Sequence, residues 1–340
     1  MPRVAGVDPG TLSIDVCGLE DGHLFLDRTI PTAAALADPD GFVSLIRGER
    51  PPDLIAGPSG YGLPLVPAAS ATESDLRLAF LAPTGEEAGI GGLRRLARAL
   101  GRSGLPVVYT PGVIHLDTVP AHRKVNRVDL GTADKVALAA LGIADQCDRF
   151  GCLPGEASFL LLELGGAFTA ALAVRHGRVV DGLGGSSGPM GWHSSGGWDG
   201  EVAYLAGTVT KDHLFRGGAR FLSDGIHAFA ESALKAVHAL LVSVPEPREI
   251  LLSGRTLAEP GVVPLLHAGL APLAPVRRLE GFARVAKPGA QGAAVLADGL
   301  AGGRWAALVE RMRIREAAGT VLDHLVVISP AEARRHLGLG

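Results

Sequence analysis

The feature that most constrains the fold is a layout of strands that occurs twice along the chain. The first copy runs from a short apolar strand at Arg3–Val7, through a polar turn, to strands at Ser13–Leu19 and His23–Ile30. The second copy begins about 155 residues later and repeats the order of strand, small-residue turn, strand, hairpin and strand. Two such units in a chain of 340 residues predict a duplicated α/β fold, with one copy in each half.

The second copy also indicates where the two halves of the chain divide. Its strands are expected at Ala157–Glu163, Phe168–Val174 and Arg178–Leu183. Pro and Gly cluster just ahead of it at Cys152–Gly155, which is typical of a linker. We therefore predict an N-terminal lobe at 1–153 and a C-terminal lobe at 154–340. A hydrophobic content of 47% is enough for each lobe to bury a core.

Helices and buried strands are expected between and after the two copies. Apolar residues at helical spacing predict helices at Asp40–Arg47, Glu86–Leu100, Ala133–Ile143, Asp199–Ala206, Arg220–Leu241 and Gln291–Gly299. Short apolar runs predict buried strands at Asp53–Gly57, Leu105–Tyr109 and Glu249–Leu252. In the tail we expect a helix after Arg304, a short strand at His324–Ile328 and a terminal helix from Ser329. Gly, Pro and Ser predict loops at Gly57–Ala71 and Gly182–Gly200.

The bulk composition excludes several classes of partner. A net charge of −3 with 20% charged residues gives no reason to expect nucleic acid. The apolar runs at Ser158–Leu164 and Ala233–Val244 are too short or too interrupted to span a membrane, and the N-terminus does not resemble a signal peptide. The three cysteines, Cys17, Cys147 and Cys152, form no C-x-x-C pair and no disulfide framework. They are expected to be core or surface thiols in a reducing cytoplasm.

The first candidate site is the turn Asp8-Pro9-Gly10-Thr11, with Ser13 at the start of the next strand. A tight turn between two strands points backbone N–H groups and small hydroxyls into one concavity, which binds anionic oxygens. A carboxylate beside it, here that of Asp8, can hold Mg²⁺ through water. An ordinary hairpin in which Asp starts the turn explains the same residues when they are taken alone.

Two further turns have the same character. Gly165 and Gly166 follow a strand, and two glycines let a phosphate approach the backbone without a Cβ in the way. Ser253-Gly254-Arg255 ends an apolar strand, and such an end marks the carboxyl edge of an α/β sheet, where ligands bind. Each of these turns alone is equally explained as a plain connection between elements.

The order of the three turns along the chain resembles that of the acetate and sugar kinase, heat-shock chaperone and actin superfamily. The resemblance covers most of the chain and implies two ribonuclease-H-like lobes, the actin-like ATPase domains, around a central cleft. It implies that ATP binds between the lobes, with the two hairpins gripping the phosphates and the Ser-Gly turn facing adenosine. It also implies that the small-residue helix at Gln291–Gly299 packs at the hinge.

Within this superfamily the chain looks most like butyrate and acetate kinases, and more narrowly like a family described as butyrate-kinase-like. The segments that carry the resemblance are Val7–Thr11, Lys124–Lys135, Gly188–Met190 and Asp199–Glu201. It implies an ATP- and Mg²⁺-dependent phosphotransferase that acts on a small molecule, with a short-chain carboxylate as a candidate acceptor. One departure puts the carboxylate in doubt, because carboxylate kinases usually carry Asn where this chain has Asp8.

The segment Lys124–Lys135 of the N-terminal lobe supplies candidates for the chemistry, since phosphoryl transfer depends on charge neutralisation and positioning. Arg127 is the candidate for contact with substrate or phosphate, because guanidinium binds both with two parallel hydrogen bonds. Asn126 and Lys135 are candidate substrate contacts, and Asn126 and Asp129 are candidates to orient Arg127. Asp134 is a candidate general base or Mg²⁺ ligand. A solvated helix face for Lys135 and a helix cap for Asp129 are open alternatives.

The loop Gly184–Gly200 adds two candidates, because a loop this rich in Gly and Ser is either disordered or wraps a ligand. His193 is a candidate acid, base or phosphate ligand, with an exposed loop histidine as the alternative. Asp199 is a candidate metal ligand, in competition with a role as the cap of the helix that follows it.

Other functions of the same superfamily stay open. Activators of radical dehydratases hold an iron–sulfur cluster between subunits, and the cysteines here are poorly placed for one. Carbamoyl-transfer relatives use paired histidines on a helix, and Pro120 interrupts His115 and His122. An ATP-binding regulator that is not an enzyme is a further alternative. Relatives often dimerise through the second lobe, and the sequence leaves open whether this chain forms a homodimer.

Overall fold

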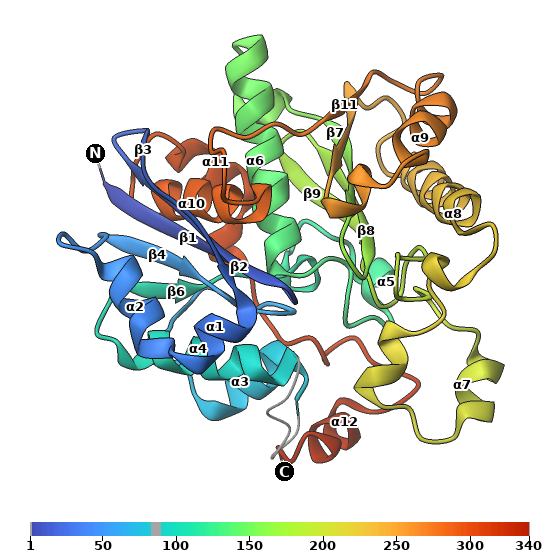
Figure 1. The fold of residues 1–340 in the computed structure, drawn as a ribbon, viewed down its shortest axis with the longest axis horizontal. Helices are drawn as coiled ribbons and strands as arrows, with labels where there is room; N and C mark the ends of the chain where they lie inside the picture. Colours follow the sequence, from blue (N-terminus) through green and yellow to red (C-terminus); the bar gives the residue numbers. More distant parts are fainter. Residues whose placement is uncertain (1, 83–89, 340) are drawn as a thin grey trace.

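Two β-sheets form the centre of the molecule in the computed structural model, which describes residues 2–82 and 90–339 (Figure 1). The strands of the first sheet are β1 (Arg3–Pro9), β2 (Ser13–Glu20), β3 (His23–Pro31), β4 (Leu54–Gly57), β5 (Val66–Pro67) and β6 (Val107–Tyr109). Those of the second are β7 (Phe159–Leu164), β8 (Thr169–Arg175), β9 (Arg178–Leu183), β10 (Glu249–Ser253) and β11 (Val276–Arg278).

The two sheets share one design. Their strand orders are β3-β2-β1-β4-β6-β5 and β11-β10-β7-β8-β9. In each sheet the first three strands in the chain form an antiparallel meander, and one later strand, β4 or β10, joins its first member in parallel. This confirms the duplicated α/β fold with two ribonuclease-H-like lobes, because the repeated layout in the sequence is the meander of each sheet.

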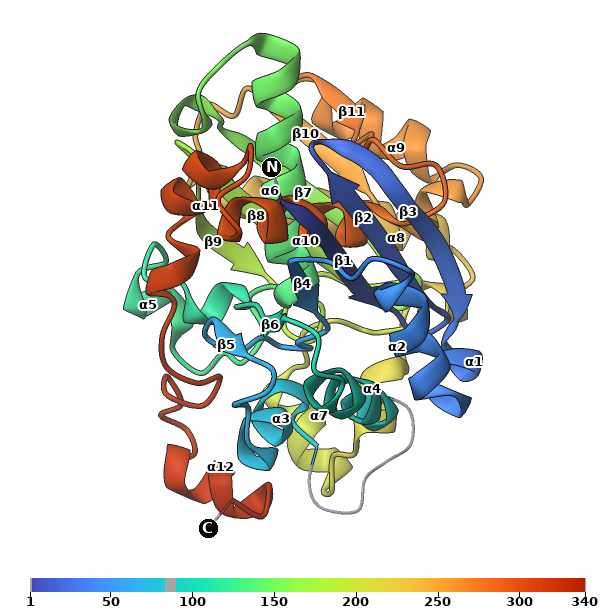
Figure 2. The ribbon, with the colours of Figure 1, turned by 90° about the vertical axis from the view of Figure 1, so that its left-hand side faces the viewer.

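Helices cover both faces of both sheets. On the outer face of the first sheet lie α1 (Thr32–Ala37), α2 (Pro39–Arg47), α3 (Glu73–Phe80) and α4 (Ile90–Arg102), and on that of the second lie α8 (Gly225–Leu240) and α9 (Val262–Leu270). Between the sheets stand α6 (Ala133–Phe150) and α10 (Pro288–Leu300) (Figures 1 and 2). The shorter helix α11 (Ala306–Met312) packs beside α10, and α5 (Ala121–Lys124), α7 (Gly200–Ala206) and α12 (Pro330–His336) lie at the periphery.

The two central helices interlock the halves of the chain. Helix α10, from the second half, packs directly on β1, where a Cβ on Gly6 would lie 2.2 Å from the backbone nitrogen of Ala294. It packs as closely on α6, where a Cβ on Gly292 would lie 1.9 Å from the carbonyl oxygen of Ala137. Only small residues allow such an approach, which is why α10 is rich in Gly and Ala. The division at residues 153 and 154 stays a prediction.

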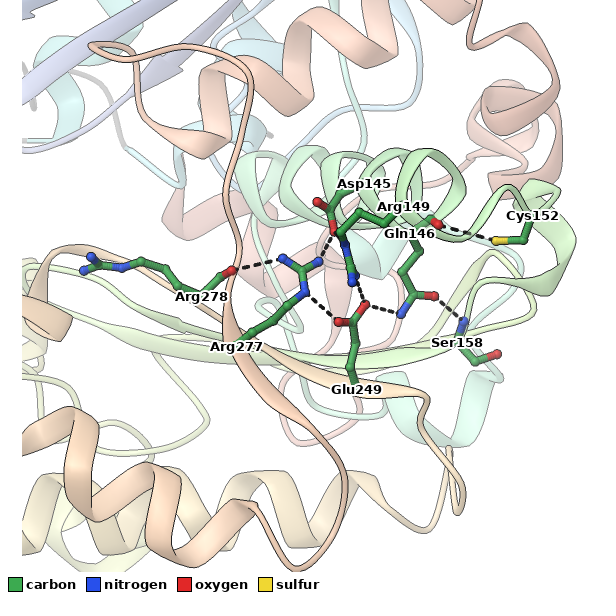
Figure 3. A network of polar contacts seen from close by, with 8 residues as sticks. All are labelled: Asp145, Gln146, Arg149, Cys152, Ser158, Glu249, Arg277 and Arg278. Atoms are coloured by element: carbon green, nitrogen blue, oxygen red, sulfur yellow. Dashed lines mark hydrogen bonds and ion pairs between the residues drawn. The ribbon is translucent and has the colours of Figure 1, made fainter.

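A buried ion network ties α6 to the second sheet (Figure 3). Glu249, at the amino end of β10, has a side chain only 3% exposed. Its carboxylate accepts hydrogen bonds from Gln146 Nε2 and Arg277 Nε, both at 2.6 Å, and also pairs with Arg149. Three donors compensate the desolvation of one carboxylate. The network lies at the end of β10 opposite to Ser253, so we assign it a structural role.

Most expected elements are present, and the differences have local reasons. The strand expected at His324–Ile328 is wrong: the segment is irregular, because the Asn126 side-chain oxygen accepts the N–H groups of Val326 and Val327 at 2.7 and 2.9 Å. The expected helix Glu86–Leu100 is α4, and its predicted first residues, 86–89, lie outside the described residues.

The sequence patterns did not predict α1, α3, α5, α9, β5 or β11, and β5 interrupts the loop expected at Gly57–Ala71. Helix α3 begins with a capping box, in which Thr72 and Asp75 each bond the other's backbone N–H. That signal is visible in the sequence. Within the described residues, no helix is long and apolar enough to cross a membrane.

Candidate functional site

The turn between β1 and β2 forms one wall of the candidate site. The backbone N–H of Gly10 donates to the carbonyl of Ser13 at 2.9 Å, and Thr32 Oγ1 donates to the carbonyl of Gly10 at 2.7 Å. A Cβ on Gly10 would lie 2.6 Å from that Ser13 oxygen and 2.8 Å from Lys287 Nζ. Glycine is therefore required at Gly10 by close packing, and Thr11 is left exposed at the tip of the turn.

The turn between β7 and β8 forms the other wall, together with the turn after β10. Ser253 pairs with Glu163 in the sheet, and Thr256 Oγ1 donates to the carbonyl of Gly165 at 2.6 Å. Gly254 has φ 109°, and a Cβ there would lie 2.2 Å from the carbonyl oxygen of Leu164. The two turns predicted from Gly165–Gly166 and Ser253–Arg255 thus form a single surface at the carboxyl edge of the second sheet.

A lysine at the start of α6 joins the two walls. Lys135 Nζ lies 3.1 Å from Glu163 Oε2 on β7 and also bonds Asp134. Burial and these two carboxylates act on the lysine, and the carboxylates raise its pKa above the usual range. Asp8, at the end of β1, interacts electrostatically with both Asp134 and Lys135. The bends of the two sheets therefore converge on one group of charges.

This charged cluster contains more acid than base. We define it by its six members: Asp8, Asp15, Asp134, Lys135, Glu163 and Lys287. Lys287 Nζ pairs with Asp15 Oδ2 at 2.7 Å and donates to the Ser13 carbonyl at 3.1 Å. Four carboxylates thus face two ammonium groups, which leaves an excess of negative charge when all are ionised. Such an excess favours a bound cation.

Burial shifts the pKa of two carboxyl groups in this cluster upward. The pKa of Asp8 rises to about 7, first because the group is buried and then because Asp134 is near, while Lys287 and Lys135 oppose the shift. Burial also raises the pKa of Glu163. Asp134 goes the other way, because Lys135 and Thr132 bond its oxygens and hold its pKa below the usual range. Asp8 is therefore the better general base near neutral pH.

The first turn of α10 completes the surroundings of Asp8. A Cβ on Gly289 would lie 2.5 Å from Asp8 Oδ2, so the carboxyl group rests against the backbone at the start of this helix. Free N–H groups at a helix N-terminus favour anionic oxygens. Sequence reasoning missed this contribution and Lys287 with it. The sequence signal for this helix start is Lys287-Pro288, because Pro is typical of the first helical position and Pro288 is the first residue of α10.

The cluster could hold Mg²⁺ only with help from a ligand. Within residues 2–82 and 90–339, no group of three His, Cys, Asp or Glu side chains is arranged to hold a metal ion. Mg²⁺ is commonly bound by one or two carboxylates together with phosphate oxygens and water. The carboxylates of Asp8 and Glu163, with open space for a phosphate at Gly166, fit that pattern.

The structure places the other predicted site residues in different surroundings. Asn126 holds the C-terminal tail through its side-chain oxygen, so its amide is already engaged. Arg127 is exposed and has no side-chain partner in the described part of the chain. Asp199 caps α7 by accepting the Glu201 N–H at 2.8 Å, at the periphery of the molecule. The alternative of a helix cap for Asp199 thus accounts for its geometry.

His193 lies in the Gly-rich loop Gly184–Gly200, and Asp129, which precedes α6, bonds the same loop. Asp129 is buried and accepts hydrogen bonds from Gly131 and from the backbone and hydroxyl of Ser186. Asp129 therefore orders the loop. It does not cap a helix, so the alternative given for this residue is wrong. His193 Nε2 contacts Arg220, and partial burial and this cation lower its pKa. Whether these residues bind a substrate stays a prediction.

Comparisons with solved structures show the fold. A propionate kinase from Francisella tularensis subsp. tularensis SCHU S4 has a TM-score of 0.58 and 12% identity, over 86% of this chain and 99% of that chain. Acetate kinase from Entamoeba histolytica has a TM-score of 0.55 and 10% identity, over 80% and 87%. Acetate kinase from Porphyromonas gingivalis has a TM-score of 0.52 and 13% identity, over 75% and 84%.

These similarities give the chain an actin-like ATPase fold, and at such identities they show the fold alone. No curated protein matches the sequence. A family model does match, over residues 6–327, which is nearly the whole chain. The chain therefore belongs to the family described as "Protein of unknown function (DUF1464)".

Proposed function

We propose that the protein is an ATP- and Mg²⁺-dependent phosphotransferase that acts on a small molecule. The observation that carries the proposal is the convergence of two glycine-containing bends, one from each sheet, on a cluster joined by the Lys135–Glu163 ion pair at 3.1 Å. Phosphoryl transfer needs positioned cations and backbone donors around a phosphate chain more than it needs covalent chemistry. The cluster offers both.

The roles follow from the surroundings of each residue. Thr11 at the exposed tip of one bend and Gly166 in the other would hold the phosphates, since an added Cβ on Gly166 would meet nothing closer than 3.9 Å. Gly10 and Gly165 would shape the two bends, because each is closely packed. Asp8 and Glu163 would hold Mg²⁺ together with those phosphates. The turn Ser253–Arg255 would face the nucleoside. Kinase folds of the compared structures agree with this use of the surface but do not fix a substrate.

Lys135 and Lys287 would neutralise negative charge as a phosphoryl group moves. Both ammonium groups are held by carboxylates, at 3.1 Å from Glu163 and 2.7 Å from Asp15. This fixes their positions, so little reorganisation is needed during the reaction. Asp134 serves here to position Lys135, because its lowered pKa makes it a weak base.

The acceptor is proposed to be a short-chain carboxylate, and Asp8 provides the test. A carboxylate acceptor is already ionised and needs no general base, whereas a sugar hydroxyl must lose a proton. With a pKa of about 7, Asp8 is able to take that proton. Asp8→Asn keeps the shape and removes the base. Because Asp8 would also hold Mg²⁺, Asp8→Asn is expected to slow either kind of kinase, and a sugar kinase is expected to lose more activity because it loses its general base as well.

The experiment is a coupled assay of ADP release with Mg-ATP against a panel of short carboxylic acids and sugars. The wild type is compared with Asp8→Asn and Asp8→Ala, and with Asp212→Asn, an exposed aspartate, as control. Acceptor-dependent ADP release that Asp8→Ala abolishes supports the proposal. ATP binding with only slow hydrolysis and no response to any acceptor indicates the regulator instead. Full activity in Asp8→Ala refutes the assigned site.

A further inference from the structure

A groove on the outer face of the first sheet carries an unusual density of arginine. Three arginines of α4, Arg95, Arg98 and Arg102, are spaced by three and four residues, so they share one face of the helix. That face meets α2, whose last turn carries Arg47. Helices α2 and α4 lie side by side at the lower left of Figure 1. Between them is a cavity of about 470 Å³, which we call the arginine groove.

The positive charge of the arginine groove is only partly compensated by the protein. Arg98 makes a bidentate pair with Glu73, at 2.9 and 3.0 Å, and Arg47 donates to the carbonyl of Ser103 at 2.7 Å. Arg95 and Arg102 are exposed and have no side-chain partner in the described part of the chain. Among residues 2–82 and 90–339, Asp40 is the one carboxylate that lines the groove.

Like charges three and four residues apart on a helix repel one another. The protein as a whole carries a net charge of −3, so this local excess of cations runs against its average. A bound anion would relieve the repulsion and satisfy the free guanidinium groups with paired hydrogen bonds.

We propose that the arginine groove binds a small polyanion that carries two or more phosphate or carboxylate groups. Its volume lies in the range of sites for small molecules, which is too confined for a nucleic acid duplex. The buried side chain of Val43 and that of Ala99 line it beside the arginines, and apolar lining strengthens charge–charge contacts.

This site is separate from the charged cluster between the lobes. Helices α2 and α4 pack on one face of the first sheet, within the core that includes Ile46 and Leu96. Helix α10 and the charged cluster lie on the opposite face. Binding in the groove therefore does not depend on the phosphotransferase function proposed above.

The test is isothermal titration of the full chain with pyrophosphate, citrate and inorganic phosphate at constant ionic strength. The variant Arg95→Gln/Arg102→Gln removes the two unpaired cations. Its control, Arg175→Gln/Arg335→Gln, removes two exposed arginines elsewhere. Ser44→Glu places a carboxylate in the groove and removes no arginine, so it carries the test if the double variant fails to fold.

A further variant separates the groove from the charged cluster. Gly166→Val alters the second bend, where an added Cβ meets nothing closer than Arg255 at 3.9 Å. If pyrophosphate binds in the groove, its affinity is unaffected by this change. Pyrophosphate that binds between the lobes is weakened by it.

We expect saturable binding of pyrophosphate or citrate, tighter than that of inorganic phosphate. We expect it to be about tenfold weaker in Arg95→Gln/Arg102→Gln and in Ser44→Glu, and unchanged in the control pair. If pyrophosphate binds more tightly than citrate, the natural ligand is a phosphorylated compound, and if citrate binds more tightly, it is a polycarboxylate. Either result supports the proposal. No saturable binding, equal weakening in the control pair, or weakening only in Gly166→Val overturns it.

Discussion

The carboxyl group of Asp8 links the stability of the ligand-free protein to pH. Its pKa in the folded protein is about 7, against an ordinary value of 3.8, because the group is buried next to Asp134. A shift of about three pKa units corresponds to about 4 kcal/mol. The free energy needed to keep Asp8 charged in the folded protein is therefore a large part of a typical free energy of unfolding, which is about 5–15 kcal/mol.

The direction of the effect follows from where the proton is held. Below pH 3.8 the folded and unfolded states both carry it. Between 3.8 and 7 the folded state keeps a proton that the unfolded state has lost, so the free energy of unfolding falls as the pH rises. Above 7 both states have lost it, and the destabilisation is complete.

The perturbation that tests this is Asp8→Asn, which cannot ionise. The variant is expected to be more stable than the wild type at pH 8, and the difference should grow by about 3 kcal/mol between pH 5 and pH 8. Urea unfolding followed by tryptophan fluorescence, in buffer with EDTA and without nucleotide, measures it. Asp212→Asn is the control, because its side chain is exposed. Parallel stability curves for Asp8→Asn and the wild type across this range would refute the reasoning.

Three further outcomes are expected from urea unfolding. Lys135→Met leaves two partly buried carboxylates without their cation and should cost about 3 kcal/mol. The exposed Lys235→Met should cost less than about 1 kcal/mol, and equal losses would contradict the role of the ion pair. Gly254→Ala brings a Cβ within 2.2 Å of a carbonyl oxygen and should cost about 3 kcal/mol, against about 1 for Gly22→Ala, which meets nothing within 4 Å. His115 has a pKa lowered to about 4 by burial, so the free energy of unfolding should fall by about 3 kcal/mol as the pH drops from 6.5 towards 4. His115→Gln should remove that part of the acid sensitivity, and an unchanged pH profile in this variant would exclude His115 as its source.

The turns of the two meanders were predictable because they depend on neighbouring residues. Asp21-Gly22 and His176-Gly177 both have positive φ at both positions, at 52° and 78° and at 51° and 69°. Such turns match the twist of the strands on either side, and Gly accepts this backbone at low cost. Alternation of apolar residues then sets the strands on either side, so the two meanders were readable from local patterns.

The tail shows where local patterns mislead. His324–Ile328 has the apolar, β-branched composition of a strand, but the segment joins neither sheet. Asn126, about 200 residues away in the chain, supplies the hydrogen-bond acceptor that a neighbouring strand would have supplied. The place of Asn126 in the segment Lys124–Lys135 predicts a contact with substrate. The sequence alone does not show that the tail already occupies its side-chain oxygen.

The sequence by itself determined the two meanders, the positions of the three small-residue turns and the helix that later packs between the sheets. Tertiary structure alone decided that Lys287 meets Asp15 across 272 residues, that Lys135 joins Asp134 to Glu163, and that Asp8 is buried among them. Turn geometry and hydrophobic period are set by residues a few positions apart. The charge and protonation of a buried group depend on everything packed around it, which only the complete fold brings together.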